Sequence, residues 1–321
     1  MATTTPSAPA TPIPASPPSP GTPTPDSRPF AATSFWNAPL ADNAPLDSNS
    51  AGYVAELRRQ VSAYGTWMNT DQYSSPVYTV PANQPTVRVT LDQPAGVLPD
   101  LRAAWDQVPI PPDAQPAAGT DHTLVVWQPS TNTMWEFWVM NKQADGWHAA
   151  YGGRMLNVSS NPGYFTDPPS WGATATSLPF LGGLVRIDEL RAGRIDHALA
   201  LAIPQARAGW YSWPAQRTDG NLNSSAAIPE GTRFRLDPHL NIAALGLPPL
   251  TRMLAEAAQR YGIVVRDQGG CVAFYGEDPT PLGTNPYAGP DGFYQGDWVN
   301  HLLAQFPWAQ LQTLKTDLRS S

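Results

Sequence analysis

The chain has 321 residues, of which 41% are hydrophobic and 10% aromatic, and its formal net charge is −7. This length is enough for one large hydrophobic core or two small ones. The sequence contains no run of 18 apolar residues, so no transmembrane helix is predicted. It also lacks a Lys/Arg cluster, which argues against nucleic acid as a partner. The single cysteine, Cys271, allows no internal disulfide.

Residues 1–28 form a segment rich in Pro, Thr, Ser and Ala, in which Asp26 and Arg28 are the charged residues. Such a composition cannot bury enough apolar surface to offset the entropy of ordering, so it predicts a disordered linker in front of one domain at residues 29–321. We expect that Met1 replaces a removed secretion signal and that the protein is extracellular. Linkers of this kind are frequent in bacterial polysaccharide-degrading enzymes, and a generic secretion stalk is the alternative.

The first predicted element is a helix over residues 50–64. Val54, Leu57 and Val61 recur at spacings of three and four, and Gly65 can end the helix. Alternating β-forming residues then predict short strands, and the fragment QPSTN joins two of them into a hairpin. The strands are expected at 75–80, 85–91, 121–127 and 133–141, with 146–158 continuing the same sheet.

In the second half of the chain, residues 187–193 predict one helical turn closed by Gly193, and residues 249–262 predict a second amphipathic helix. Residues 194–203 predict a central strand that is apolar on both faces. A further strand is expected at 231–237, and 263–278 predicts a hairpin that turns at two glycines. These elements indicate a mainly β domain, a sandwich, jelly roll or barrel with two or three peripheral helices, expected to be monomeric.

The fragment TMWEFWVMN places one carboxylate, Glu136, among large apolar side chains. On a strand Glu136 shares a face with Trp138, and a carboxylate beside an indole suits a glycan groove. An apolar setting also raises the pKa of a glutamate, as a general acid requires. The alternative is an edge-strand glutamate that points into water or pairs with an arginine.

Three further residues are candidates for catalysis. His122 shares the face of Glu136 if the hairpin register pairs Val126 with Glu136. Asp196 and His197 precede the apolar run ALALAI, where a carboxylate and an imidazole need partners. We therefore expect Asp196 to pair with Glu136, whereas the alternative is a buried hydrogen-bond network.

The fragment GWYSWPAQRTDG predicts a loop with exposed aromatic residues. Tyr211, Trp213 and Arg217 in this loop, together with Arg186, are the candidates for substrate binding. The alternative is that the aromatic residues cover the core. Asp267, just before the two glycines, is interpreted as turn chemistry.

Sequence motifs for several catalytic classes are missing. The chain has no GxSxG elbow, HExxH, CxxC pair, Walker loop or GxGxxG after a strand. Its histidines show no ligand-like spacing. The sequence therefore predicts neither a metal nor a cofactor.

Five stretches, RIDHALAL, WPAQRTDG, GTRFRLDP, YGIVVRDQGG and DHTLVVWQPSTNTMWEFW, resemble a group of secreted bacterial β-rich proteins. The resemblance extends from Phe30 to Asp278. It implies a single domain and secretion, and it brings no catalytic assignment.

The leading functional hypothesis is an endo-acting glycoside hydrolase on a plant or microbial polysaccharide, with Glu136 and Asp196 as paired carboxylates. One alternative is a polysaccharide lyase that uses His122 or His197 as a base, although an acidic chain with few lysines suits an anionic substrate poorly. The other is a non-catalytic glycan-binding or cell-surface module, which needs the aromatic residues and not the acids.

Overall fold

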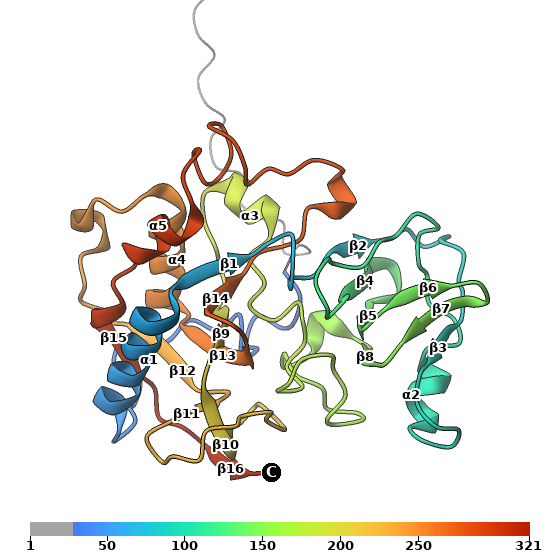
Figure 1. Cartoon of the computed structure of the whole chain (residues 1–321), viewed down its shortest axis with the longest axis horizontal. Helices are drawn as coiled ribbons and strands as arrows, with labels where there is room; N and C mark the ends of the chain where they lie inside the picture. Colours follow the sequence, from blue (N-terminus) through green and yellow to red (C-terminus); the bar gives the residue numbers. More distant parts are fainter. Residues whose placement is uncertain (1–27) are drawn as a thin grey trace, which may run out of the picture.

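The computed structural model describes residues 28–321, so the linker predicted for residues 1–28 lies, but for Arg28, outside the described residues. In this range the chain forms sixteen strands in four sheets and five α-helices (Figure 1). The prediction of a mainly β fold is confirmed, with more helices than expected. No helix in residues 28–321 is both long and apolar enough to cross a membrane.

The largest sheet has six strands, and β9 lies inside it with all five of its residues buried. The predicted hairpin at 263–278 is wrong, because β9 lies between β13 and β14, parallel to the first and antiparallel to the second. A strand that is apolar on both faces is most stable between two other strands. Residues 269–271 connect β13 to β14 across the end of β9. The strand order is β1 (Thr66–Asn69), β14 (Val272–Tyr275), β9 (Leu199–Ile203), β13 (Ile263–Gln268), β12 (Arg233–Leu236) and β15 (Leu311–Thr313).

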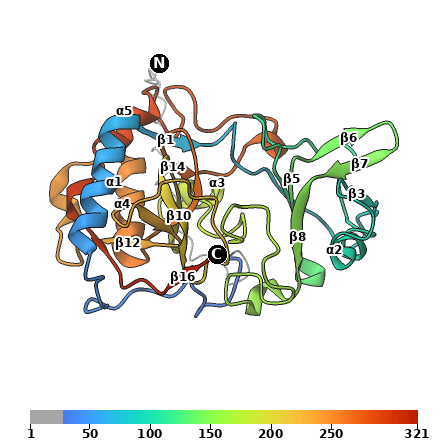
Figure 2. The same cartoon turned by 60° about the horizontal axis from the view of Figure 1, so that its bottom comes forward.

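Helices cover one face of this sheet (Figures 1 and 2). Leu201 of β9 shares a hydrophobic core with Leu57, Leu254 and Leu303, each from a different helix. The two long helices agree with the apolar periodicity of the sequence. The covering helices are α1 (Ser50–Tyr64), α4 (Pro249–Arg260) and α5 (Val299–Ala304).

The opposite face of the six-stranded sheet packs against a second β region, here defined as residues 77–155. Ala200 and Ala202 of β9 share a core with Trp105 and Phe137 of that region, so β9 contributes to both cores of the molecule. One of its sheets is β2 (Val77–Thr79), β4 (Leu124–Gln128), β5 (Thr133–Trp138) and β8 (Tyr151–Met155), and the other is β3 (Val89–Leu91), β7 (Gly146–Ala149) and β6 (Asn141–Gln143), with α2 at Pro99–Ala104.

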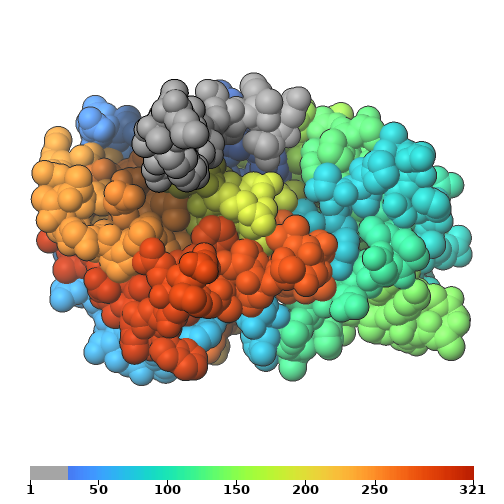
Figure 3. All heavy atoms as spheres, turned by 90° about the horizontal axis from the view of Figure 1, so that it is seen from above, coloured from blue at the N-terminus to red at the C-terminus, as the bar shows by residue number. Residues whose placement is uncertain are grey.

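The β4–β5 hairpin forms as predicted, and β8 continues its sheet, whereas β7 joins the other sheet of the second β region. Two smaller elements complete the fold. The first is α3 (Ile187–Ala192), which ends at Gly193 as expected. The second is a sheet of β11 (Ile228–Glu230), β10 (Ala206–Ser212) and β16 (Leu318–Ser320). Figure 3 shows the C-terminal part of the chain, in orange and red, reaching the second β region.

Two glycines with the same left-handed backbone provide a matched test of this packing. Gly183 has φ +73° and Gly193 has φ +75°. A Cβ at Gly183 would lie 2.3 Å from the backbone nitrogen of Ala200, whereas a Cβ at Gly193 would meet no atom within 4 Å. We expect Gly193→Ala to lower the free energy of unfolding by about 1 kcal/mol, from backbone strain alone. Gly183→Ala should cost about 3 kcal/mol or more, because β9 must also shift.

Urea denaturation of both variants measures this difference. Equal losses would show that the contact between Gly183 and β9 does not constrain the sheet.

Candidate functional site

Glu136 lies in β5, which is buried on both faces up to Phe137. The carboxylate of Glu136 is fully buried, and it accepts hydrogen bonds from the backbone N–H groups of Ala173 (2.7 Å) and Phe180 (2.8 Å). The expectation that it lines a groove is therefore wrong. The expectation for its pKa is confirmed, because burial raises that pKa to about 7 despite these two bonds.

Trp138 ends β5 and is 39% exposed. Its indole Nε1 donates a hydrogen bond to Oδ1 of Asp121 at 3.3 Å. His122 follows Asp121 outside β4, exposed and with φ +41°. The hairpin pairs Val125, not Val126, with Glu136, so the predicted position of His122 beside Glu136 is wrong.

Asp196 and His197 precede β9 rather than lying within it. The carboxylate of Asp196 pairs with Arg194 at 3.0 Å. His197 contacts Glu189 through Nε2 at 3.0 Å and the carbonyl oxygen of Ala198 through Nδ1 at 2.7 Å. Burial alone lowers the pKa of His197, but the Glu189 carboxylate raises it above its ordinary value.

The predicted pair of Glu136 and Asp196 is therefore wrong, since each of these carboxylates has its own partners in a different place. For His197, buried beside Glu189, the alternative of a buried polar network describes the structure, whereas Asp196 is partly exposed beside Arg194.

The two arginines predicted to bind substrate are engaged within the protein. Arg186 makes a bidentate ion pair with Glu277, with N–O distances of 2.9 and 3.0 Å. Arg217 donates hydrogen bonds to four backbone carbonyl oxygens. Its guanidinium therefore holds the backbone in place and is not free to bind substrate. Those carbonyls belong to Ser170, Gly172, Thr174 and Ala175.

Of the aromatic residues of the predicted loop, Trp210 is exposed, whereas Tyr211 and Trp213 are half-buried. Tyr211 lies in β10 rather than in a loop, and it pairs with Glu230 in the strand ladder. Trp213 packs edge-on against Tyr164 at 5.0 Å, and the guanidinium of Arg319 lies 4.2 Å from its ring centroid. For Trp213 the alternative, that the ring covers the core, describes the structure.

The register of β13 shifts at two charged residues, Arg266 and Asp267. Val265 pairs with Leu201 and Asp267 with Ala202, so Arg266 is an extra residue in the strand. A β-bulge of this kind re-aims side chains and is frequent beside active sites.

Arg266 is almost fully buried by the contacts that it makes. It donates hydrogen bonds to the carbonyl oxygens of Phe180 (2.8 Å) and Gly182 (3.0 Å), and its guanidinium lies 4.1 Å from the ring centroid of Tyr275. Glu136 thus binds the backbone N–H of Phe180, and Arg266 binds its carbonyl oxygen. These two bonds fix Phe180 between the six-stranded sheet and the second β region.

Asp267, the next residue, belongs to a group of three acids. One carboxylate oxygen of each of Asp219, Glu230 and Asp267 lies within 4.8 Å of the others. We call these three residues the carboxylate cluster. Glu230 in β11 is fully buried, Asp267 in β13 is half-buried, and Asp219, in the connection between β10 and β11, is exposed. The cluster is therefore open to solvent on the side of Asp219.

Local hydrogen bonds orient the cluster. Oε2 of Glu230 accepts from the hydroxyl of Thr218 (2.6 Å) and from the backbone N–H of Asp219 (3.1 Å). Oδ1 of Asp219 accepts from Nε2 of Gln268 at 3.0 Å, and the backbone N–H of Gln268 donates to Asp267. Within residues 28–321, the buried Oε1 of Glu230 has no hydrogen-bond partner.

The cluster is strongly acidic, and no lysine or arginine of the described chain forms an ion pair with it. Burial, reinforced by Asp219 and Asp267, raises the pKa of Glu230 well above its usual range. Burial and Asp219 raise the pKa of Asp267 to about 7, against the opposing charge of Arg266. Asp121 of the second β region, which accepts the hydrogen bond of Trp138, adds to this rise.

None of these three residues is among the site candidates that the sequence indicated. The interpretation of Asp267 as turn chemistry is wrong, because Asp267 lies inside β13, and Glu230 lies in β11. The available signal was a charged residue within a short β-forming run, which needs a partner once the run is buried.

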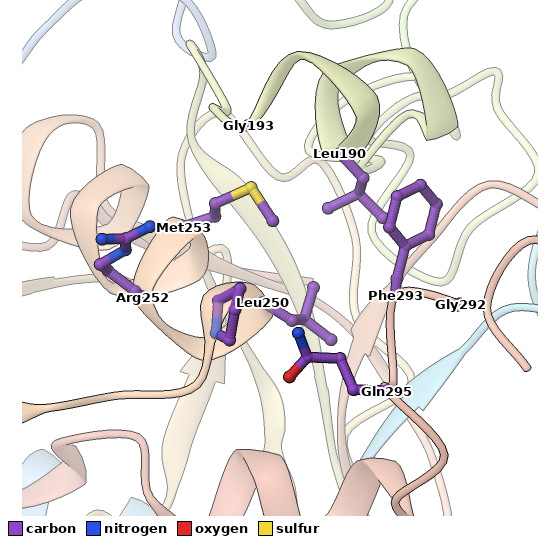
Figure 4. A pocket seen from close by; sticks show the side chains of 9 residues that line it. Leu190, Gly193, Leu250, Arg252, Met253, Gly292, Phe293 and Gln295 are labelled. Carbon is purple, nitrogen blue, oxygen red and sulfur yellow. The ribbon is translucent and has the colours of Figure 1, made fainter. Parts of the chain in front are cut away.

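A separate pocket lies between α3, α4 and residues 292–295, with a volume of about 200 Å³ (Figure 4). Leu190, Met253 and Phe293 give it apolar walls, and Arg252 and Gln295 lie at its edge. Pockets for small ligands usually hold about 300–1,000 Å³. The pocket therefore has little room for chemistry, and the carboxylate cluster is the stronger candidate site.

Carboxylates held this close can share protons, as acid–base pairs do, or can coordinate a cation. Comparison with known proteins does not decide between these chemistries, since no protein-family model, curated protein or solved structure matches the chain.

Proposed function

We propose that the protein is a carbohydrate-active enzyme, a glycoside hydrolase in which Asp219 and Asp267 are the two acting carboxylates. The observation that carries this proposal is their geometry. An exposed and a half-buried carboxylate have oxygens within 4.8 Å of each other. These residues replace Glu136 and Asp196 in the two-carboxylate mechanism that the sequence suggested.

In this mechanism the carboxyl group of Asp267 gives its proton to the glycosidic oxygen while the carboxylate of Asp219 attacks the anomeric carbon. Water, deprotonated by Asp267, then releases the sugar from Asp219. Retaining enzymes have carboxyl groups about 5–5.5 Å apart, whereas inverting enzymes leave about 6.5–9.5 Å for a water molecule. The separation in the cluster therefore favours retention of the anomeric configuration.

Trp138 offers the sugar-stacking surface of this proposal. Its ring is held at the end of β5 by the hydrogen bond to Asp121, and a rigid exposed indole suits the apolar face of a sugar. We expect Trp138→Ala to weaken glycan binding about fivefold to tenfold, which corresponds to roughly 1 kcal/mol.

Isothermal titration calorimetry with the preferred oligosaccharide measures this loss. Trp298→Ala is the matched control, because Trp298 is 68% exposed at the start of α5, and α5 contributes no residue to the cluster. Equal affinities of the Trp138 and Trp298 variants would remove Trp138 from the binding surface.

A non-catalytic glycan-binding module is the second candidate, favoured by the exposure of Trp138 together with the complete burial of Glu230. The lyase hypothesis has less support, because His197 is ion-paired with Glu189 and Arg186 with Glu277. His122 remains an exposed base.

A panel of polysaccharides, with reducing ends and unsaturated uronates both measured, tests the three alternatives. Reducing ends alone support the hydrolase. Unsaturated uronates would indicate a lyase, and binding without either product would indicate a binding module.

Secretion and the single-domain organisation are also part of the proposal. The composition of residues 1–28 supports a linker exposed outside the cell. The contribution of β9 to both hydrophobic cores supports one domain at residues 29–321.

A further inference from the structure

We infer that the carboxylate cluster is a binding site for one divalent cation of the size of Ca²⁺. This inference goes beyond the proposed hydrolysis, because binding is measured without any glycan. It rests on three carboxylates from separate parts of the chain whose oxygens converge within 4.8 Å, and on a buried oxygen with no partner.

The unpartnered Oε1 of Glu230 is the independent observation. A buried polar atom without a hydrogen bond is costly, so such atoms are rare in folded proteins. The other oxygen of the same carboxylate is fully engaged by Thr218 and by the backbone of Asp219. The group is therefore fixed in place, with one coordinating oxygen left free inside an acidic cluster.

The donor set and its spacing favour calcium. All three groups supply hard oxygen ligands, which Ca²⁺ and Mg²⁺ prefer over softer donors. Oxygens on opposite sides of a Ca²⁺ ion lie about 4.6–5.2 Å apart, whereas around Mg²⁺ they lie only about 4.0–4.2 Å apart. Oxygens that lie within 4.8 Å of one another can surround Ca²⁺, whose flexible coordination tolerates irregular geometry, whereas Mg²⁺ demands a near-ideal octahedron.

The surroundings of the cluster prepare it for a cation. Gln268 donates hydrogen bonds to Asp219 and to Asp267, and Thr218 orients Glu230, as partners of metal ligands commonly do. No lysine or arginine in residues 28–321 pairs with the three acids. A divalent cation would supply the missing positive charge, and water or a sugar hydroxyl could complete its coordination on the exposed side of Asp219.

The test uses the full chain after removal of metal with EDTA, titrated with CaCl₂ in a calorimeter at pH 7.5. We expect one Ca²⁺ per chain and weaker binding of Mg²⁺. Asp219→Asn and Glu230→Gln should each weaken Ca²⁺ binding about tenfold or more, because each removes one charged ligand. Ca²⁺ should also raise the melting temperature of the wild type and not that of the variants.

Asp188→Asn is the matched control. Asp188 is 90% exposed and, within residues 28–321, its one ion pair is with Arg191, so this variant should bind Ca²⁺ like the wild type. Asp219 is also exposed, so its replacement by Asn leaves the core intact and gives an answer even if the Glu230 variant does not fold.

Absence of Ca²⁺ uptake at millimolar concentration would overturn the inference, as would unchanged binding by Asp219→Asn. The two proposals also fail separately. Ca²⁺ binding without turnover of any glycan contradicts only the hydrolase, and turnover without Ca²⁺ binding contradicts only the cation site. Because the cation and the transferred proton use the same oxygens, we expect saturating Ca²⁺ to suppress hydrolysis.

Discussion

Asp267→Asn is expected to lower the turnover of the glycan substrate by about 100-fold or more, since loss of general acid–base catalysis typically costs a factor of 10² to 10⁴. The amide keeps the shape of the side chain and cannot transfer the proton. Reducing-end release at saturating substrate measures the effect. Affinity for the glycan should stay close to that of the wild type.

The stability of the same variant separates catalysis from folding. The folded-state pKa of Asp267 is raised to about 7, so its stabilising contribution is complete below the unfolded pKa of about 4 and is lost as the pH rises through 7. Asn does not ionise, and the variant should therefore melt at the same or a higher temperature than the wild type at pH 8. A variant that is folded and keeps full turnover would exclude Asp267 from the reaction.

Glu136→Ala is expected to lower the free energy of unfolding by about 2–4 kcal/mol. The backbone N–H groups of Ala173 and Phe180 lose their acceptor in a fully buried place, and each unsatisfied group costs about 1–3 kcal/mol. Part of this cost is offset because a carboxylate no longer has to be buried. Urea denaturation at pH 7 measures the loss.

Turnover per folded molecule of the Glu136 variant should equal that of the wild type, because its carboxylate has no access to substrate. Glu256→Ala is the control, since Glu256 is exposed on α4 and its replacement should change stability by less than about 0.5 kcal/mol. Unchanged stability of Glu136→Ala, combined with lost turnover, would restore the catalytic role that the sequence suggested.

The sequence predicted those parts of the fold that depend on local pattern. Apolar spacing predicted α1 and α4, and the turn residues between β4 and β5 predicted their hairpin. The two glycines after β13 carried an equally local signal and gave the wrong pairing. The strand that separates β13 from β14 comes from residues 199–203, and a turn signal contains no information about so distant a segment.

The site was harder to predict, for a related reason. The apolar neighbours of Glu136 in the sequence predicted its raised pKa, but its partners are backbone N–H groups about 40 residues further along the chain. Every residue except proline has a backbone N–H group, so the sequence does not show which ones bind Glu136. The carboxylate cluster unites a loop and two strands, with a bulge at Arg266 that re-aims Asp267, and neither is visible in a single sequence.

The most direct test of the carboxylate cluster as the functional centre compares the turnover of Asp267→Asn with that of Asp196→Asn on the same glycan. Both changes replace an aspartate by its isosteric amide, and both residues are partly accessible. Asp196 pairs with Arg194 at 3.0 Å, outside the cluster. We predict that Asp267→Asn is inactive and that Asp196→Asn turns over like the wild type. Full turnover by Asp267→Asn together with an inactive Asp196→Asn would contradict the assignment of the active site to the cluster.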